Sequence, residues 1–239
     1  MIKKKLLKYL KGPFFSKKEI HVKQEIINRY LYMSSIDDPI YVEKNNVQEK
    51  WSIEKFENEM EVKYLSNLFF EEKKDLIWMI KKCDHALHDG FIDEKQRWLG
   101  IFIENEIRNG KIAPTYIKWI DPIMEWGIFA RENINAGVFV AEYTGCIKKY
   151  KRAIDDHNAY CFEYSIGGVK KTPFTIDAKE KGNLSRFINH SFSPNLLQVP
   201  AYLDGIMHVV FRSSRNIKKG EQLTYNYGSQ YWKKRENPL

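Results

Sequence analysis

The sequence predicts an α+β fold in which a helical N-terminal region is followed by small curved β-sheets. Apolar residues recur at helical spacing as far as Asn109-Gly110, and from Ala113 the chain changes to short β-type runs separated by glycine turns. A chain of 239 residues with 43% apolar and 14% aromatic residues can bury a packed core. We therefore expect a helical region over residues 1–110, a β-rich domain over residues 114–232 and a basic tail over residues 233–239.

The N-terminal region predicts several helices. An apolar pattern among lysines predicts one that ends at Gly12-Pro13, and a second is expected from Ser16 to Met33, where Glu19 follows a serine cap. Such a basic amphipathic helix binds some membrane surfaces, but its interrupted apolar stripe favours docking on the rest of the chain. The apolar faces are rich enough to pack on the domain or to form a homodimer.

Residues 51–109 predict two or three further helices. Apolar residues recur at helical spacing from Trp51 to Phe69 and again from Leu76 to Ile80. Cys83, His85 and His88 lie close together in the sequence and resemble metal ligands. A metal site needs further ligands with supporting hydrogen bonds, and none can be identified, so a satisfied helix end is the favoured interpretation.

The second half of the chain predicts strands. Short β-type runs lie at residues 116–120, 127–130, 138–143 and 208–212, and turn pairs such as Ala136-Gly137 separate them. The polar stretch over residues 148–159 predicts a helix inserted between strands. No Gly-x-Gly-x-x-Gly follows a strand, which disfavours a Rossmann fold.

Charge and cysteine content restrict the partners and the compartment. The net charge of +8 divides into +5 over residues 1–50, −3 over residues 51–113 and +6 over residues 114–239. A basic surface draws a protein towards nucleic acid or acidic surfaces, or only keeps it soluble, so charge does not decide the partner. Three lone cysteines without a Cys-x-x-Cys spacing indicate a reducing compartment, and neither a membrane span nor a signal peptide is expected.

One stretch combines polar and apolar residues unusually closely: Gly182-Asn-Leu-Ser-Arg-Phe-Ile-Asn-His-Ser-Phe-Ser-Pro-Asn195. Turn signals at both ends leave room for one or two helical turns. Taken alone, the stretch is equally well explained as an N-capped turn whose polar side chains face water.

Together with four other blocks, this stretch resembles the SET-domain family of protein lysine methyltransferases over roughly residues 114–232. The other blocks are Glu125-Trp-Gly-Ile-Phe-Ala130, Ala141-Glu-Tyr-Thr-Gly145, Thr175-Ile-Asp-Ala178 and Glu221-Gln-Leu-Thr-Tyr-Asn-Tyr-Gly228. The resemblance implies small curved sheets and a C-terminal pseudoknot, in which Asn216–Gly228 passes through a loop and brings Asn189 against Tyr227. It also implies S-adenosyl-L-methionine as the cofactor and a lysine of a basic protein as the substrate.

The resemblance implies a channel for the substrate lysine that is built from tyrosines. Tyr227 would orient the amine and the methyl group, and Tyr225 would hold a water beside the amine and so favour monomethylation. Tyr143 and Tyr160 match the other channel positions. A phenol offers an apolar wall with a polar tip, and its ring face attracts a cation. The alternative for Tyr227 is a core tyrosine bonded to a carbonyl group.

The resemblance also implies a cofactor pocket. Its predicted residues, besides Tyr227, are Trp126, Gly127, Arg186, Phe187, Asn189, His190 and Trp232. Glu125 stands where the family usually has a first glycine, and we expect it to be tolerated if its φ stays negative.

The family's zinc modules are not expected here. Phe192 stands where the zinc-binding cysteine would be, and no cysteine follows Cys161, so no metal is predicted. Trp232 would instead cover the pocket by stacking; the alternative is a frayed basic tail with the tryptophan on the surface.

The missing zinc modules and the Lys/Asn/Ile-rich composition resemble bacterial members of the family, including those of chlamydia-like intracellular bacteria. We therefore expect a histone or bacterial histone-like protein as the substrate, with nucleic acid only indirectly nearby. The expected location is the cytoplasm or nucleoid of a bacterium, or a host nucleus after secretion. The competing function is a non-catalytic SET module that binds protein or nucleic acid.

Overall fold

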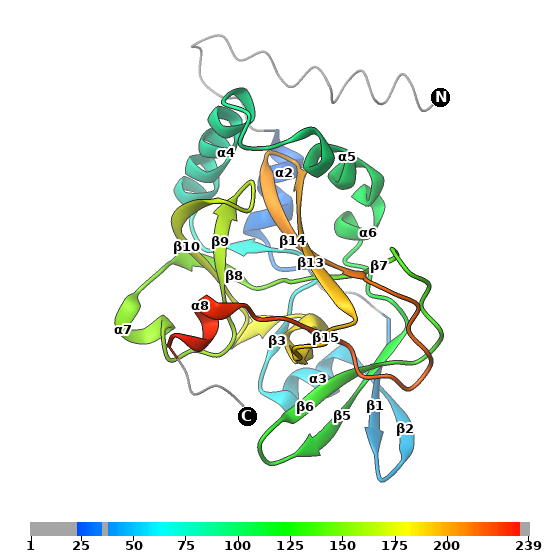
Figure 1. Ribbon diagram of the computed structural model, residues 1–239. Coiled ribbons are helices and arrows are strands. Elements are labelled where there is room, and N and C mark those ends of the chain that lie inside the picture. Colours follow the sequence, from blue (N-terminus) through cyan, green and yellow to red (C-terminus); the bar gives the residue numbers. More distant parts are fainter. Residues whose placement is uncertain (1–22, 35–37, 235–239) are drawn as a thin grey trace.

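The computed structural model describes residues 23–34 and 38–234. In Figure 1, helices α4, α5 and α6 gather at one end of the molecule, and the β1–β2 and β5–β6 hairpins lie at the other. The α+β class is confirmed. The helix predicted before Gly12-Pro13, the first part of the Ser16–Met33 helix and the end of the basic tail lie outside the described residues.

The first part of the described chain contains strands as well as the predicted helices. Its elements are α2 Gln24–Leu31, β1 Ile40–Lys44, β2 Val47–Trp51, α3 Ile53–Met60, β3 Lys63–Tyr64, β4 Phe69–Phe70, α4 Lys73–His88, α5 Glu94–Phe102 and α6 Glu104–Arg108. The helix predicted from the spacing of Trp51 to Phe69 therefore ends at Met60, and the prediction is wrong for the residues that follow. Glu61 adopts a left-handed conformation (φ 53°) that ends α3, and the chain then pairs with distant strands.

The helix end at Cys83, His85 and His88 is satisfied, as predicted. Cys83 is buried, and the Nδ1 atom of His88 lies 2.8 Å from the carbonyl oxygen of Asp84 one turn earlier. None of the helices among the described residues is long and apolar enough to cross a membrane.

The second half of the chain forms mostly short strands, as predicted. They are β5 Thr115–Asp121, β6 Glu125–Ala130, β7 Phe139–Glu142, β8 Cys146–Lys149, β9 Cys161–Ile166, β10 Lys170–Asp177, β11 Lys181–Gly182, β12 Asn189–His190, β13 Leu196–Leu203, β14 Ile206–Ser213 and β15 Thr224–Tyr225. The helix predicted over residues 148–159 is shorter, α7 Arg152–Asp155, because β8 occupies the start of that stretch.

The two halves share sheets. The sheet orders are β2-β1-β5-β6, β4-β8-β10-β9 and β13-β14-β7, with two-stranded pairs β11-β3 and β12-β15. Strands from the first half pair in parallel with β5, β8 and β11 of the second half. One main cluster of buried apolar residues also draws on both halves, from Tyr30 to Leu223. The domain boundary predicted at residues 110–114 stays a prediction. Strands and core residues from both sides of it pack together.

Removing residues 1–110 should therefore give an aggregating fragment. Strands β5, β8 and β11 would lose their parallel partners, and exposed strand edges and apolar faces promote association. Size-exclusion chromatography of a 114–239 fragment beside the full chain tests this expectation. A soluble and fully active fragment would show that the N-terminal half is dispensable.

Candidate active site

The stretch at residues 182–195 folds into a single tight turn followed by extended chain. The turn is the 3-10 helix η1 Leu184–Phe187, which Asn183 caps by accepting a hydrogen bond from the backbone N–H of Ser185 at 2.9 Å. The Asn183 amide also donates to the carbonyl of Glu142 at 3.0 Å. Asn183 and Ser185 are each 1% exposed, so the alternative of a turn with polar side chains in water is wrong for these two residues.

The C-terminal segment is bound to this stretch by hydrogen bonds. β12 pairs in parallel with β15, and Asn195 holds the segment from both sides by donating to the carbonyl of Gln222 at 2.8 Å and accepting from the N–H of Thr224 at 3.0 Å. The backbone N–H of Tyr227 donates to Nδ1 of His190 at 3.1 Å. The expected juxtaposition of the two segments is present, and their threading as a pseudoknot stays a prediction.

A cavity of about 340 Å³ opens beside these two segments. Tyr143, Tyr225 and Tyr227 line it, and these are three of the four predicted channel tyrosines. The remaining lining residues come mainly from the β8–β9 connection, from β9 and β10 and from the C-terminal helix α8 Ser229–Trp232: Tyr150, Asp155, Ala159, Cys161, Phe162, Glu163, Lys171, Thr172, Phe174, Thr175, Gln230, Tyr231 and Lys234.

The three tyrosines are oriented by neighbouring groups. The Tyr227 hydroxyl donates to the carbonyl of Ile188 at 2.9 Å, and the Tyr143 hydroxyl donates to the carbonyl of Tyr160 at 2.7 Å. The ring of Tyr225 lies 4.7 Å from that of Tyr227. The carbonyl bond expected of a core tyrosine is thus present in Tyr227, but its ring also lines the cavity. A phenol that donates its proton keeps its lone pairs as acceptors.

Burial keeps these phenols neutral. Desolvation raises the pKa of Tyr227 above its ordinary value, and nearby Tyr231 and Tyr160 add to the effect. The pKa values of Tyr143 and Tyr225 are also raised by burial and by neighbouring tyrosines. None of the three can carry a negative charge near neutral pH, so each acts as a hydrogen-bonding group and not as a strong base.

Tyr160, Arg186 and Phe187 lie apart from this cavity. The Arg186 guanidinium stacks 4.0 Å from the centroid of the Tyr160 ring and donates to the carbonyl of Ala178 at 2.8 Å. Burial lowers the pKa of Arg186. Phe187 is buried in the main core, edge-on to Phe56. These three residues hold η1 in place, and the substrate and cofactor contacts expected of them stay predictions.

The aromatic side chains of Phe192, Tyr227 and Trp232 surround His190. The His190 ring lies 4.8 Å from the Trp232 ring and 4.5 Å from the Phe192 ring, both edge-on. Trp232 lies parallel to Tyr227 at 6.0 Å, with 11° between the planes. Trp232 is thus packed against the predicted pocket and is not a frayed surface residue. Burial lowers the pKa of His190 and favours its neutral form.

Three buried nitrogen atoms in and near this cluster have no hydrogen-bond partner within the described part of the chain: His190 Nε2, Trp232 Nε1 and Gln222 Nε2. Buried polar atoms are nearly always paired, so unsatisfied ones near one site point to a ligand or ordered water. The Asn189 amide closes the cluster by donating to the carbonyl of Trp126 at 3.1 Å.

Two residues of the Glu125-Trp126-Gly127 turn bear on its predicted role: Gly127 and Glu125. A Cβ atom at Gly127 would lie 2.6 Å from Cδ1 of Ile120 and 2.9 Å from Nε2 of Gln222, so any other residue there would have to displace the ends of these two side chains. Glu125 has a φ of +55°, so the condition under which a side chain was expected to be tolerated at this position is not met. The left-handed conformation continues the bulged end of the β5–β6 hairpin, where Asp121 pairs with Glu125.

Glu125→Gly should therefore raise the free energy of unfolding by up to about 1 kcal/mol. An L-residue in the left-handed region costs about 1–2 kcal/mol, and the greater freedom of glycine in the unfolded chain offsets part of that gain. Urea denaturation of the variant measures the change. Glu125→Ala removes the same side chain but keeps the strain, so equal stabilisation by both variants would contradict this explanation.

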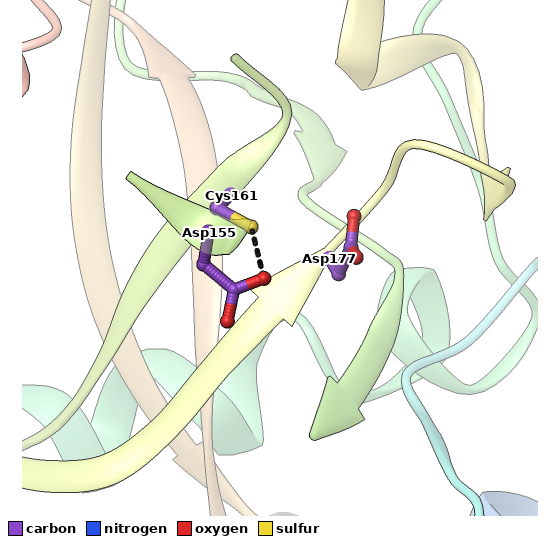
Figure 2. A group of neighbouring side chains, drawn as sticks. All are labelled: Asp155, Cys161 and Asp177. Carbon is purple, nitrogen blue, oxygen red and sulfur yellow. Dashed lines mark hydrogen bonds between the residues drawn. The ribbon is translucent and has the colours of Figure 1, made fainter. Parts of the chain in front are cut away.

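Asp155, Cys161 and Asp177 form a group with metal-ligand chemistry (Figure 2), and their ligand atoms lie within 4.8 Å of one another. The Lys148 ammonium compensates this charge, 3.1 Å from an oxygen of Asp155 and 2.6 Å from an oxygen of Asp177. Burial alone would lower the pKa of Lys148, but its hydrogen bonds to both carboxylates outweigh burial and raise it. We therefore interpret the group as an ion cluster that fixes α7 against β10.

Sequence reasoning missed much of the cavity wall. Tyr150, Phe162 and Lys234 line the cavity, and none was predicted to do so. They lie in the polar insertion, in a short strand and just beyond α8, where no apolar period or motif distinguishes them. The one sequence feature that could have indicated a lining residue was the position of Tyr150 at the start of the polar insertion.

The comparisons with known proteins agree with this geometry. The model of the family described as "SET domain" matches residues 125–228. The histone-lysine N-methyltransferase Su(var)3-9 of Drosophila pseudoobscura pseudoobscura is 33% identical over 51% of this chain and 21% of its own. EHMT1 of Mus musculus is 34% identical over 46% of this chain and 9% of its own. SUVH5 of Arabidopsis thaliana, specific for histone H3 lysine 9, is 38% identical over 43% of this chain and 13% of its own.

Two solved structures are similar over about half of the chain. An active polycomb repressive complex 2 in the basal state has 29% identity over 52% of this chain and 16% of that chain, with a TM-score of 0.46. SUVH6 of Arabidopsis thaliana, in complex with SAM, has 31% identity over 48% of this chain and 27% of that chain, with a TM-score of 0.43.

The matched region contains most of the described site, and Tyr231, Trp232 and Lys234 follow it. It begins at the Glu125 turn and ends at Gly228, directly after Tyr227. The chain spans about a fifth or less of the length of the first curated relatives that it matches. Residues 125–228 of this chain are a SET domain, homologous to those of the histone-lysine N-methyltransferases.

Proposed function

We propose that this protein is a protein-lysine N-methyltransferase that uses S-adenosyl-L-methionine. The observation that carries the proposal is the position of Tyr227 between two features. Tyr227 lines the tyrosine cavity, and its ring also packs against the rings of His190 and Trp232, each of which carries an unsatisfied nitrogen. The names of the relatives, all histone-lysine N-methyltransferases, support the same reaction.

The aromatic cluster fits a cofactor that carries a flat heterocycle. His190 Nε2 and Trp232 Nε1 offer two polar atoms without partners in the described chain, and their rings offer stacking surfaces. The Trp126-Gly127 backbone lies close by, because the carbonyl of Trp126 accepts a hydrogen bond from Asn189. We assign the cofactor to Trp126, Gly127, Asn189, His190, Tyr227 and Trp232. When bound, S-adenosylmethionine supplies a methyl group on a positively charged sulfur.

The tyrosine cavity fits the side chain of a lysine. Three phenol rings exclude water from the methylene stem and attract the cationic end, and hydroxyl oxygens can accept hydrogen bonds from the amine. The amine must be neutral to attack a methyl carbon, and desolvation beside the buried rings of Tyr143, Tyr225 and Tyr227 would lower the pKa of a bound lysine. Tyr227 then aims the lone pair of the nitrogen, and the neutral phenols do not compete for a proton.

The proposed substrate is a histone or a bacterial histone-like protein, because the relatives are named for histones and because a basic tail offers exposed lysines. We propose that monomethylation dominates, since Tyr225 lines the cavity beside Tyr227. On composition and lone thiols we place the protein in a bacterial cytoplasm or nucleoid, with a host nucleus as the alternative.

The reaction is tested by incubating the full chain with isotopically labelled S-adenosylmethionine and a mixture of basic proteins. Mass spectrometry should locate the label on lysine side chains. Label on no residue, with the cofactor bound, would instead favour a non-catalytic SET module.

Cofactor binding can be measured separately by calorimetry. We expect His190→Ala and Asn189→Ala each to weaken the binding of S-adenosylmethionine about ten-fold, because each removes a group worth about 1–2 kcal/mol in a closed site. Wild-type protein should bind without added zinc. Unchanged binding in both variants, or a requirement for zinc, would contradict the assigned pocket.

A further inference from the structure

A lysine of the chain itself lies at the rim of the tyrosine cavity. Lys234 follows α8 and lines the cavity together with Tyr150. Its ammonium group lies 2.5 Å from Oδ1 of Asp156, donates to the hydroxyl of Tyr150 at 2.9 Å and lies 4.9 Å from the centroid of the Tyr150 ring. Figure 1 shows α8 beside α7, as these contacts require.

Asp156 and Tyr150 form one cation-binding pair. The Tyr150 hydroxyl donates to the same Asp156 oxygen that Lys234 contacts. The Asp156 side chain is only 17% exposed, and the Lys234 side chain is 39% exposed. Hydrogen bonds from Lys234 and Tyr150 lower the pKa of Asp156, and its carboxylate raises the pKa of Lys234. The Nε atom of Arg152 lies 3.6 Å from the other carboxylate oxygen of Asp156, and the Arg152 side chain is 90% exposed.

A short segment that begins with Gly228 connects Tyr227 to Lys234. Gly228 follows Tyr227 directly and adopts a φ of +84°, and a Cβ there would meet nothing within 4 Å. The chain between this glycine and Lys234 carries Gln230 and Tyr231, which also line the cavity. The Lys234–Asp156 contact therefore joins the segment that carries Gln230 and Tyr231 to the connection between β8 and β9.

We propose that Asp156 and Tyr150 are a binding site for a cationic side chain next to the target lysine of the substrate. Lys234 occupies this site in the free protein and competes with the substrate for it. This proposal rests on the proposed function in one respect only, which is that the occupant is a side chain of a substrate peptide. A carboxylate beside an aromatic ring is the environment that a lysine or arginine side chain prefers, and the site borders the cavity assigned to the lysine.

The test uses two fluorescein-labelled peptides, Gly-Ala-Arg-Lys-Arg-Ala-Gly and Gly-Ala-Ala-Lys-Ala-Ala-Gly, whose binding is measured by fluorescence anisotropy on the full chain. Lys234→Ala should bind the arginine peptide about two- to five-fold more tightly than wild type, the range that one partly exposed ion pair supports. The alanine peptide should bind both proteins equally. Lys219→Ala, the matched control at an exposed lysine outside the cavity, should leave both affinities at the wild-type value.

Asp156→Asn provides the second arm, because the amide keeps the shape of the site but not its charge. It should lose the preference for arginine over alanine. A preserved preference in Asp156→Asn, or equal affinity of wild type and Lys234→Ala for the arginine peptide, would overturn the proposal. Methyl transfer to the two peptides is measured in parallel. Its absence with the expected binding pattern would refute the proposed function and leave this site standing.

Discussion

Tyr227→Phe should reduce the rate of methyl transfer at least about a hundred-fold. The change removes only the hydroxyl, which the carbonyl of Ile188 holds at 2.9 Å in the wall of the cavity. Loss of one preorganised hydrogen-bonding group in an active site costs about 10²–10³ in rate. The rate should be measured with saturating cofactor and a single-lysine peptide, and cofactor affinity should stay within about two-fold by calorimetry.

Tyr231→Phe is the matched control, since Tyr231 lines the same cavity from α8. Its rate should stay within about three-fold of wild type, because its hydroxyl is not assigned to the amine. Equal losses in both variants would mean that the cavity wall as a whole, and not the Tyr227 hydroxyl, supports the reaction.

The pH dependence follows from the same geometry. The pKa values of Tyr143, Tyr225 and Tyr227 are all raised by burial, so these residues stay neutral through the range in which the enzyme would be assayed. The amine of the bound lysine, ordinarily near a pKa of about 10.4, is the group that must lose a proton. The rate should rise with pH from about 7 to 9. A decline within that range would indicate that a phenol is being titrated.

Tyr225→Phe should shift the products from monomethyl-lysine to di- and trimethyl-lysine. The Tyr225 ring lies 4.7 Å from that of Tyr227 and 4.8 Å from that of Phe211, and Tyr225 lines the tyrosine cavity. A water held by this hydroxyl leaves no room for a methylated nitrogen. Displacing it costs on the order of 1 kcal/mol or more, and each ~1.4 kcal/mol is ten-fold in rate.

Mass spectrometry of a single-lysine peptide through a time course measures these products. Wild type should accumulate the monomethyl form, with the dimethyl form appearing at about a tenth of the rate or less. Tyr231→Phe is again the control, because Tyr231 lines the same cavity and its hydroxyl is not assigned to the amine. Abundant trimethyl-lysine from the unmodified protein would show that Tyr225 does not limit the product.

Much of the β-rich half was predictable because its signals are local. Glycine turns and β-branched runs gave β5, β6, β7 and β14 to within a few residues, and the capped turn at Asn183 followed from its polar spacing. The residues that meet at Tyr227 were found through resemblance of ordered blocks. Spacing alone would not have joined His190 to Tyr227, since that contact depends on chain pairing across β12 and β15.

The N-terminal half was harder to predict because its strands are completed by distant segments. β3 and β4 are two-residue strands that pair with β11 and β8. The helical spacing of Tyr64, Leu65, Leu68 and Phe69 indicated a helix instead, because it carries no signal of those distant partners. The backbone of Glu125 was unpredictable for a related reason. Its left-handed backbone is imposed by the bulged hairpin and not by its own preference.

A crystal structure of the full chain with S-adenosylhomocysteine and a single-lysine peptide tests the central claim most directly. That claim is that cofactor and lysine reach Tyr227 from opposite sides. We expect the adenine against His190 and Trp232, the lysine stem among Tyr143, Tyr225 and Tyr227, and its amine near the Tyr227 hydroxyl and the cofactor sulfur. A cofactor bound away from His190, or a lysine outside the tyrosine cavity, would contradict the account.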